Sequence, residues 1–294
     1  MCGIVGVFCK NPSLEERLGD LVSSMLIQMT DRGPDSAGVA LYGAPAPGAV
    51  KLTLRGDTPD HVAAEAGKLK AVTHSEIVLH DTHAVVPVGD EAVDPAALIA
   101  EAGLNVDLVG TGRRMELFKE VGAPADIVER FGLRQMAGTH GIGHTRMATE
   151  SAVTTDGAHP FSTGPDQCLV HNGSLSNHNR LRDSLHRAGV RIDTQNDSEV
   201  AAGYLTWRMR EGATLGEALT QALDDLDGFY TFVVGTETGF GVLRDPIACK
   251  PAVMAETDDY VAFASEFRAL TPLPGIDGAR LFEPEPARVY FWER

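Results

Sequence analysis

The chain has 294 residues, of which 43% are apolar and 22% charged, so its composition is typical of a globular protein and does not indicate disorder. The formal net charge of −16 argues against a nucleic-acid partner, because phosphate backbones are bound by clustered Lys and Arg side chains. No apolar run approaches the roughly 18–20 residues that cross a bilayer and no signal-peptide pattern is present, so we expect a cytoplasmic protein without a membrane partner.

The first third of the chain begins with a compact strand–helix–strand pattern. Residues 3–8 (GIVGVF) predict a strand, and residues 14–30 predict a helix because their apolar side chains recur at nearly helical spacing. A Gly-Pro turn then leads into a second strand over residues 37–42. The Pro- and Gly-rich stretch over residues 43–50 interrupts the pattern, and we place a boundary there.

Residues 44–135 have a different character from the segments on either side. Short apolar runs alternate with helical patterns, which is typical of α/β structure and predicts an inserted segment within a domain spanning residues 1–294. The predicted helices cover residues 59–69, 95–102 and 113–131, and the predicted strands lie around residues 76–80, 83–88 and 104–109.

The rest of the chain returns to short strands and turns. Helices are predicted over residues 177–188, from residue 200 to about 210, and over 214–226. The later strands alternate apolar and polar residues, which is typical of antiparallel sheets with one covered face.

Cys2 is the cysteine whose position needs an explanation. The other three, Cys9, Cys168 and Cys249, form no C-x-x-C pair and are expected to be reduced. Removal of the initiator Met would leave Cys2 with a thiol and a free α-amine, whose ordinary pKa of about 8 lets it accept the thiol proton. An incidental thiol at a frayed end is the alternative, although the strand that follows favours a rigidly held nucleophile.

Four other motifs could complete a site around this nucleophile. Arg32, in the turn RGPDS, could hold a carboxylate or orient the nucleophile's backbone, and Arg146 could bind a substrate carboxylate; an ordinary turn and a structural Arg–Asp pair are the alternatives. Asn172 and Gly173 could form an oxyanion hole, although Asn-Gly is also a common hairpin turn. Asp197 could bind a substrate ammonium group or only begin a helix.

The sequence offers little support for a metal site. His140, His144, His159 and His171 lie close together in the sequence, but they lack the i, i+4 spacing or a C-x-x-C partner that is typical of metal sites. We therefore expect no bound metal.

Taken in order, MCGIVG, RGPDSAG, GIGHTRMAT, VHNGSLSN and NDSEV resemble the glutaminase domain of class II glutamine amidotransferases, a family of N-terminal-nucleophile (Ntn) hydrolases. The resemblance covers about residues 1–43 and 136–270 but not the segment between them. It implies an α+β fold, a four-layer αββα sandwich of two antiparallel sheets, that hydrolyses glutamine to glutamate and ammonia through a cysteinyl thioester.

The resemblance also implies a role for each matching residue. Cys2 would be the nucleophile and its α-amine the base, while the oxyanion hole would be formed by Asn172 and Gly173. The glutamine would be held by Arg146 at its α-carboxylate and by Asp197 at its α-ammonium, with Arg32 shaping the pocket and Thr149 adding a hydrogen bond. Several relatives have an aromatic residue and a His where this chain has Met147 and Glu150, which leaves the closure of the pocket open.

The chain leaves no room for a synthase domain after the glutaminase-like strands. Its length and insertion resemble the stand-alone glutaminase subunit of split glutamate-synthase-like enzymes such as N-methylglutamate synthase. The resemblance implies that this chain carries no cofactor, that partner synthase subunits carry FMN and an iron–sulfur cluster and receive the ammonia, and that residues 44–135 help to dock them. A self-sufficient hydrolase of γ-glutamyl amides and a catalytically silent regulatory or scaffold subunit stay open as alternatives.

Overall fold

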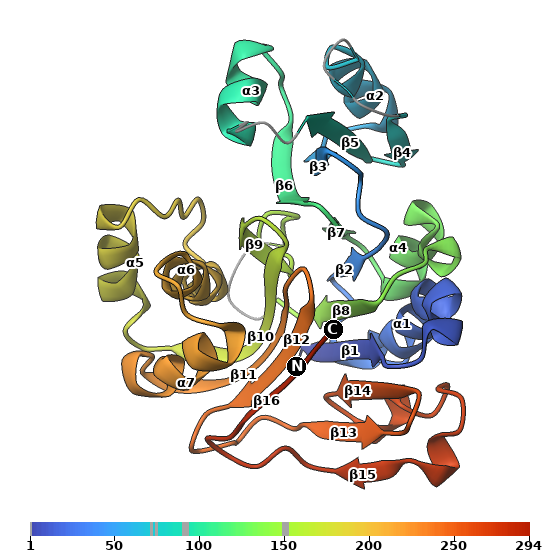
Figure 1. Cartoon of the computed structure of the whole chain (residues 1–294), viewed down its shortest axis with the longest axis vertical. Coiled ribbons are helices and arrows are strands. Elements are labelled where there is room, and N and C mark those ends of the chain that lie inside the picture. The colour runs from blue at the N-terminus through green and yellow to red at the C-terminus, as the bar shows by residue number, and fades with distance from the viewer. Residues whose placement is uncertain (1, 71–72, 74–75, 90–93, 149–152) are drawn as a thin grey trace.

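The computed structural model of the chain describes residues 2–70, 73, 76–89, 94–148 and 153–294. Two stacked antiparallel sheets form its centre, with helices on both outer faces, and a smaller sheet extends from one end (Figure 1). Within the described ranges, no helix is both long and apolar enough to cross a bilayer.

The larger sheet contains the first strand of the chain near its middle. Its strands are β1 (Gly3–Cys9), β2 (Ser36–Tyr42), β7 (Met115–Val121), β8 (His140–Arg146), β13 (Val253–Glu256), β14 (Tyr260–Ala264) and β15 (Arg280–Phe282). Among the described residues they are ordered β15-β13-β14-β1-β8-β2-β7, and all neighbours are antiparallel. β1 is therefore hydrogen-bonded on both edges.

The second sheet lies against the first and supplies the other half of the sandwich. Its strands are β9 (Phe161–Gly164), β10 (Gln167–Leu175), β11 (Gly228–Gly235), β12 (Gly239–Arg244) and β16 (Val289–Glu293). Their order is β16-β12-β11-β10-β9 in the described part of the chain, again with antiparallel pairs.

Helices cover the outer face of each sheet. α1 (Leu18–Ile27) and α4 (Pro124–Phe131) pack on the larger sheet. On the second sheet, α6 (Asp197–Arg210) and α7 (Leu215–Asp225) pack on the strands, and α5 (His178–Arg187) packs on α6. Short 3-10 helices link these elements at η1 (Pro12–Arg17), η2 (Thr30–Arg32), η3 (Leu133–Gln135), η4 (Phe267–Ala269) and η5 (Ile276–Gly278). The predicted four-layer αββα sandwich is confirmed.

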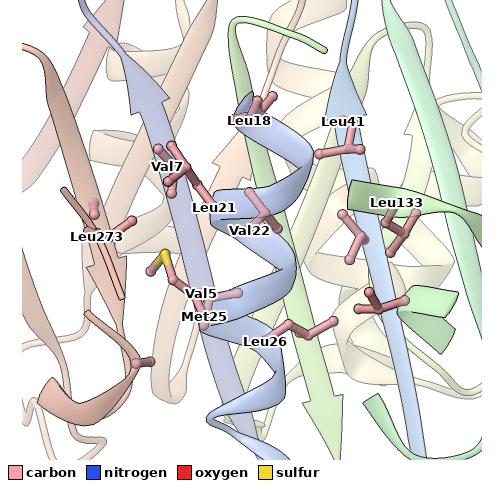
Figure 2. Packing of buried hydrophobic residues seen from close by; sticks show 14 of the residues in the cluster. Val5, Val7, Leu18, Leu21, Val22, Met25, Leu26, Leu41, Leu133 and Leu273 are labelled. Carbon is pink, nitrogen blue, oxygen red and sulfur yellow. The ribbon is translucent and has the colours of Figure 1, made fainter. Parts of the chain in front are cut away.

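The alternation of side chains along β1 explains the layers. Ile4 and Phe8 point into the space between the sheets, whereas Val5 and Val7 point to the opposite face and contact α1. Figure 2 shows the apolar side of α1 laid against these strands, with its residues Leu18, Leu21, Val22, Met25 and Leu26. All of these side chains are buried, so one strand contributes to two cores.

The smaller sheet is built from the segment after β2. It contains β3 (Ala49–Arg55), β4 (Val78–His80), β5 (His83–Gly89) and β6 (Asp107–Gly112), together with α2 (Pro59–Gly67) and α3 (Pro95–Glu101). Among the described residues, its strands are ordered β4-β5-β3-β6 and pair antiparallel. Ion pairs from Lys51 to Glu116 (2.6 Å) and from Arg55 to Glu120 (3.5 Å) connect β3 to β7 of the larger sheet.

One predicted element in this region is wrong. The sequence analysis expected a helix over residues 113–131, but these residues form β7 and then α4. Met115 and Leu117 are two residues apart and both point into the space between the sheets, as alternate residues of a strand do. Gly122, at a φ of +136°, then turns the chain before Pro124 begins the helix. Residues 115–131 therefore pack with the main sandwich, while the separate sheet ends at Gly112.

The close contact between α1 and η3 allows a stability test. A β-carbon on Gly19 of α1 would lie 2.0 Å from the backbone oxygen of Leu133. Gly19→Ala should therefore lower the free energy of unfolding by about 1–3 kcal/mol, because backbone atoms must move apart. Gly67→Ala in α2 is the matched control: no atom lies within 4 Å of the added carbon, so stability should stay equal or rise by up to about 1 kcal/mol. Equal urea midpoints for the two variants would contradict this packing.

Candidate active site

Strand alternation gathers the sequence-predicted residues at one end of the space between the sheets. Cys2 directly precedes β1 and shares the inward-facing register of Ile4. The pairing of Gly3 with Thr145 brings Cys2 beside Arg146, the last residue of β8. On the opposite sheet, Asn172 follows Val170 on the inward face of β10. Three segments that are far apart in the sequence therefore meet.

The backbone of Cys2 is fixed by two side chains. Its carbonyl oxygen accepts hydrogen bonds from Arg32 Nε (2.9 Å) and from Asn172 Nδ2 (3.2 Å). The residue is half-buried and its thiol is free, with Sγ 3.9 Å from the carbonyl oxygen of Met147. The Cys2 backbone is therefore held in place and is not a frayed end.

Arg32 acts on the protein itself in this arrangement. Its guanidinium is buried and donates from Nη1 to Glu266 Oε1 at 2.6 Å, in addition to its bond with the Cys2 carbonyl. The same hydrogen bond lowers the pKa of the Glu266 carboxyl. Arg32 therefore holds the Cys2 backbone carbonyl and a carboxylate of the protein itself.

Glu266 and Ser265 are site residues that the sequence analysis missed. Ser265 Oγ accepts from the backbone N–H of Ile4 (2.9 Å) and from Asn172 Nδ2 (3.3 Å). Both residues follow β14, which is distant in sequence but adjacent to β1 in the sheet. The pairing of β14 with β1 is what brings these two residues to Cys2. In the sequence alone, a Ser and a Glu after a strand are too common to indicate a site.

Asn172 and Gly173 lie within a strand and do not form a turn. They pair with Thr231 and Tyr230 of β11, so the hairpin-turn alternative is wrong. Gly173 has a φ of +153°, and a β-carbon there would lie 2.0 Å from the carbonyl oxygen of Phe229, so the position requires glycine. The Asn172 side chain is buried and accepts from His144 Nε2 at 3.1 Å through its Oδ1 atom.

Asp197 is the first residue of α6 and ties that helix to the end of β10. Its Oδ2 atom accepts from the backbone N–H of Leu175 at 2.8 Å, and its Oδ1 atom lies 3.9 Å from His171 Nδ1. The N-cap of the helix is Asn196, whose side chain accepts from the N–H of Ser198. The carboxylate keeps partial exposure, at 21% of its side-chain surface, so a ligand can still reach it.

Arg146 is half-buried at the end of β8, close to the turn between η2 and β2. Its backbone oxygen accepts from the N–H of Asp35 (3.1 Å), and the Asp35 carboxylate in turn accepts from the N–H of Ala148 (2.8 Å). Its guanidinium lies against Gly157. Thr149, expected to bind substrate, and Glu150 lie outside the described residues.

Three buried histidines lie near Asn172: His144 and His159 pack on each other, and His171 contacts Ser198 of α6. Burial lowers the pKa of His144 to about 3 and that of His171 to about 4, and it holds the pKa of His159 well below its usual value. These rings are therefore neutral near pH 7. Across the described ranges, no group of three or more His, Cys, Asp or Glu side chains is arranged to hold a metal ion.

The arrangement contains the parts needed for acyl transfer. A half-buried thiol faces the gap between the sheets, and a side-chain amide lies beside it with its NH2 group toward the Cys2 backbone. A cationic side chain and a carboxylate lie at the ends of β8 and β10, respectively. Such a set can attack a carbonyl, stabilise an oxyanion and hold a zwitterionic substrate.

The pair between Arg32 and Glu266 predicts a pH-dependent stability. Glu266→Gln should lower the free energy of unfolding at pH 7 by about 0.5–1.5 kcal/mol, because a buried guanidinium loses its charged acceptor, while solvent screens the carboxylate, which is 35% exposed. The folded pKa of Glu266 lies below the unfolded value near 4.5. The wild-type advantage should therefore be present above pH 4.5 and disappear as the pH falls through the folded pKa.

Urea denaturation at pH 7 and at pH 3 measures this difference. Glu285→Gln is the matched control, because Glu285 forms an exposed pair with Arg288 and its loss should change stability by less than about 0.5 kcal/mol. A wild-type advantage over Glu266→Gln that stays the same at both pH values would contradict the ion pair.

Comparison with known proteins agrees with this geometry. The family model described as "Glutamine amidotransferase domain" matches residues 144–272. The "Glutamine amidotransferase-like protein GlxB" of Rhizobium meliloti is 60% identical over 296 residues, which cover 100% of this chain and 98% of that protein. Glutamine–fructose-6-phosphate aminotransferase of Vibrio vulnificus is 33% identical over 130 residues, which cover 44% of this chain and 21% of that enzyme.

The fold has a solved counterpart. Glutamine phosphoribosylpyrophosphate amidotransferase from B. subtilis superimposes with a TM-score of 0.64 at 20% identity over 99% of this chain, which spans 47% of that protein's chain. The likeness extends over the described sandwich and supports the Ntn-hydrolase fold. The full-length relative shows that the chain belongs to the family of glutamine amidotransferase-like proteins.

Proposed function

We propose that this protein hydrolyses glutamine to glutamate and ammonia through a thioester on Cys2, and that it delivers the ammonia to a separate synthase subunit in the cytoplasm. The observation that carries the proposal is the 3.2 Å contact across the two sheets between Asn172 Nδ2 and the Cys2 carbonyl oxygen. It supports a role for the Asn172 amide as an oxyanion donor, because this NH2 group lies beside the nucleophilic residue.

The reaction begins at the α-amine that removal of Met1 would expose. The amine takes the thiol proton, and the thiolate of Cys2 attacks the carboxamide carbon of glutamine. The C=O electron pair moves to oxygen, where Asn172 Nδ2 and the Gly173 N–H donate hydrogen bonds. Collapse of this intermediate breaks the C–N bond, and the leaving nitrogen takes the proton back and departs as ammonia. Water then attacks the thioester and releases glutamate and the thiol.

Other residues hold the substrate and the nucleophile. Arg146 binds the α-carboxylate of glutamine and Asp197 its α-ammonium, with Thr149 adding a hydrogen bond. Arg32 keeps the Cys2 backbone in place, which is supported by its 2.9 Å bond to the carbonyl oxygen.

The proposed acceptor of ammonia is a partner that carries FMN and an iron–sulfur cluster, as in glutamate-synthase-like complexes. The smaller sheet is the proposed docking surface, since it extends away from the sandwich (Figure 1). Its edge strand β4 exposes Val78 and Leu79 at 46% and 51% of their surface. Neighbouring exposed apolar side chains can form part of a protein interface.

Glutaminase activity tests the catalytic part of the proposal. Cys2→Ala should lower glutamate release from glutamine by at least about 10³-fold, because the nucleophile is lost. The glutamine analogue DON should add one covalent group to Cys2, detected by peptide mass spectrometry. Cys249→Ala, which removes an exposed free thiol, is the control and should keep wild-type activity. Activity in Cys2→Ala, or retention of Met1 on the active protein, would refute the mechanism.

Surface substitutions test the docking part. Val78→Glu combined with Leu79→Glu should abolish co-purification of the partner from the native source, because charges would replace the apolar contact. Glutamate release should persist in this variant, since β4 lies outside the sandwich. Leu281→Glu on edge strand β15, where Leu281 is 46% exposed, is the matched control and should still co-purify. Unchanged partner recovery with the β4 variant would exclude this surface.

A further inference from the structure

His144 occupies a buried position directly behind the proposed oxyanion donor. It lies on β8, pairs with Ile4 of β1 and is 1% exposed. Its Nε2 atom lies 3.1 Å from Asn172 Oδ1, across the space between the two sheets. Its ring also packs on His159, with ring centroids 4.1 Å apart. The hydrogen bond to Asn172 and the packing on His159 therefore fix the orientation of the ring.

The hydrogen-bond network fixes which way the Asn172 amide faces. The Cys2 carbonyl oxygen can only accept, so the NH2 group of Asn172 must face it. Oδ1 then faces His144, and an amide oxygen can only accept, so the ring must donate from Nε2. Burial lowers the pKa of His144 to about 3, so near pH 7 the neutral ring has a single proton, which this bond places on Nε2.

The contacts on the other side of the amide differ in what they require of it. Nδ2 is 3.2 Å from the Cys2 oxygen and 3.3 Å from Ser265 Oγ, at the upper end of the usual range for hydrogen bonds. Ser265 Oγ already accepts from the N–H of Ile4, so its own proton is able to donate to an amide oxygen instead. The serine therefore tolerates both amide orientations, whereas the Cys2 oxygen and the histidine both favour the one with NH2 toward Cys2.

We propose that His144 is a positioning residue that holds the Asn172 amide with its NH2 group toward Cys2, ready to donate to the oxyanion. This inference rests on the proposed glutaminase function. Without the Nε2 donor, only the 3.2 Å contact with the Cys2 oxygen opposes rotation of the amide about its soft terminal torsion. A rotated amide would present its oxygen to the developing negative charge and repel it. The loss would affect the transition state more than the bound substrate.

Two amide substitutions separate this role from simple packing. Gln can place its amide nitrogen near the position of Nε2, whereas Asn reaches only about as far as Nδ1. The Asn and Gln side chains are both neutral and polar, so the free-energy cost of burying either one at position 144 is similar. His144→Asn should lower kcat for glutamine by roughly 10- to 100-fold with KM changed less than about threefold. His144→Gln should stay within about fivefold of the wild-type kcat.

A double-substitution cycle supplies the second readout. In the Asn172→Ala background, where no amide is left to orient, His144→Asn should cause no further fall in kcat. Thermal melting reports whether each variant is folded. If His144→Asn fails to fold, His144→Leu replaces it in both experiments with the same expected results.

The results that would overturn the positioning role of His144 differ from those that would refute the proposed glutaminase function. Equal kcat values for folded His144→Asn and His144→Gln, or a full additional loss in the Asn172→Ala background, would overturn the positioning role while wild-type glutaminase activity stands. No glutamate release and no DON labelling of Cys2 in the wild type would instead refute the proposed function, and the role of His144 with it.

Discussion

The hydrogen bonds to the carbonyl oxygen of Cys2 are the contacts on which the site depends. Arg32 approaches this oxygen from the turn after α1, and Asn172 approaches it from the opposite sheet. A residue before the first strand would otherwise be free to move. Because one atom accepts both bonds, the Cys2 backbone, the helix-to-strand turn and the second sheet are fixed relative to one another.

Burial then determines the chemistry of the groups around this contact. The histidines behind Asn172 are neutral because the space between the sheets excludes water, and a neutral ring with one proton specifies which atom donates. The Arg32–Glu266 pair keeps its charges because the two groups satisfy each other. Neighbouring buried positions therefore contain uncharged donors and one compensated ion pair.

The smaller sheet is inserted at a point that leaves the site undisturbed. β2 and β7 are antiparallel neighbours, with Tyr42 paired to Met115, so the chain leaves and re-enters the larger sheet at adjacent positions. An insertion between two paired strand ends needs no rearrangement of the strands themselves. This topology allows a further sheet to be added without altering the strand ends next to Cys2 and Arg146.

The sequence by itself determined the fold class and most elements, because alternation and helical spacing are local properties of the chain. Its short motifs predict the site residues. It misassigned residues 113–131, where a strand of mixed polarity was taken for part of a helix. Only the tertiary structure decided the partners of those motifs. Glu266, Ser265 and the His144–Asn172 bond depend on which strands pair and which faces oppose each other, and such contacts join residues up to 261 positions apart.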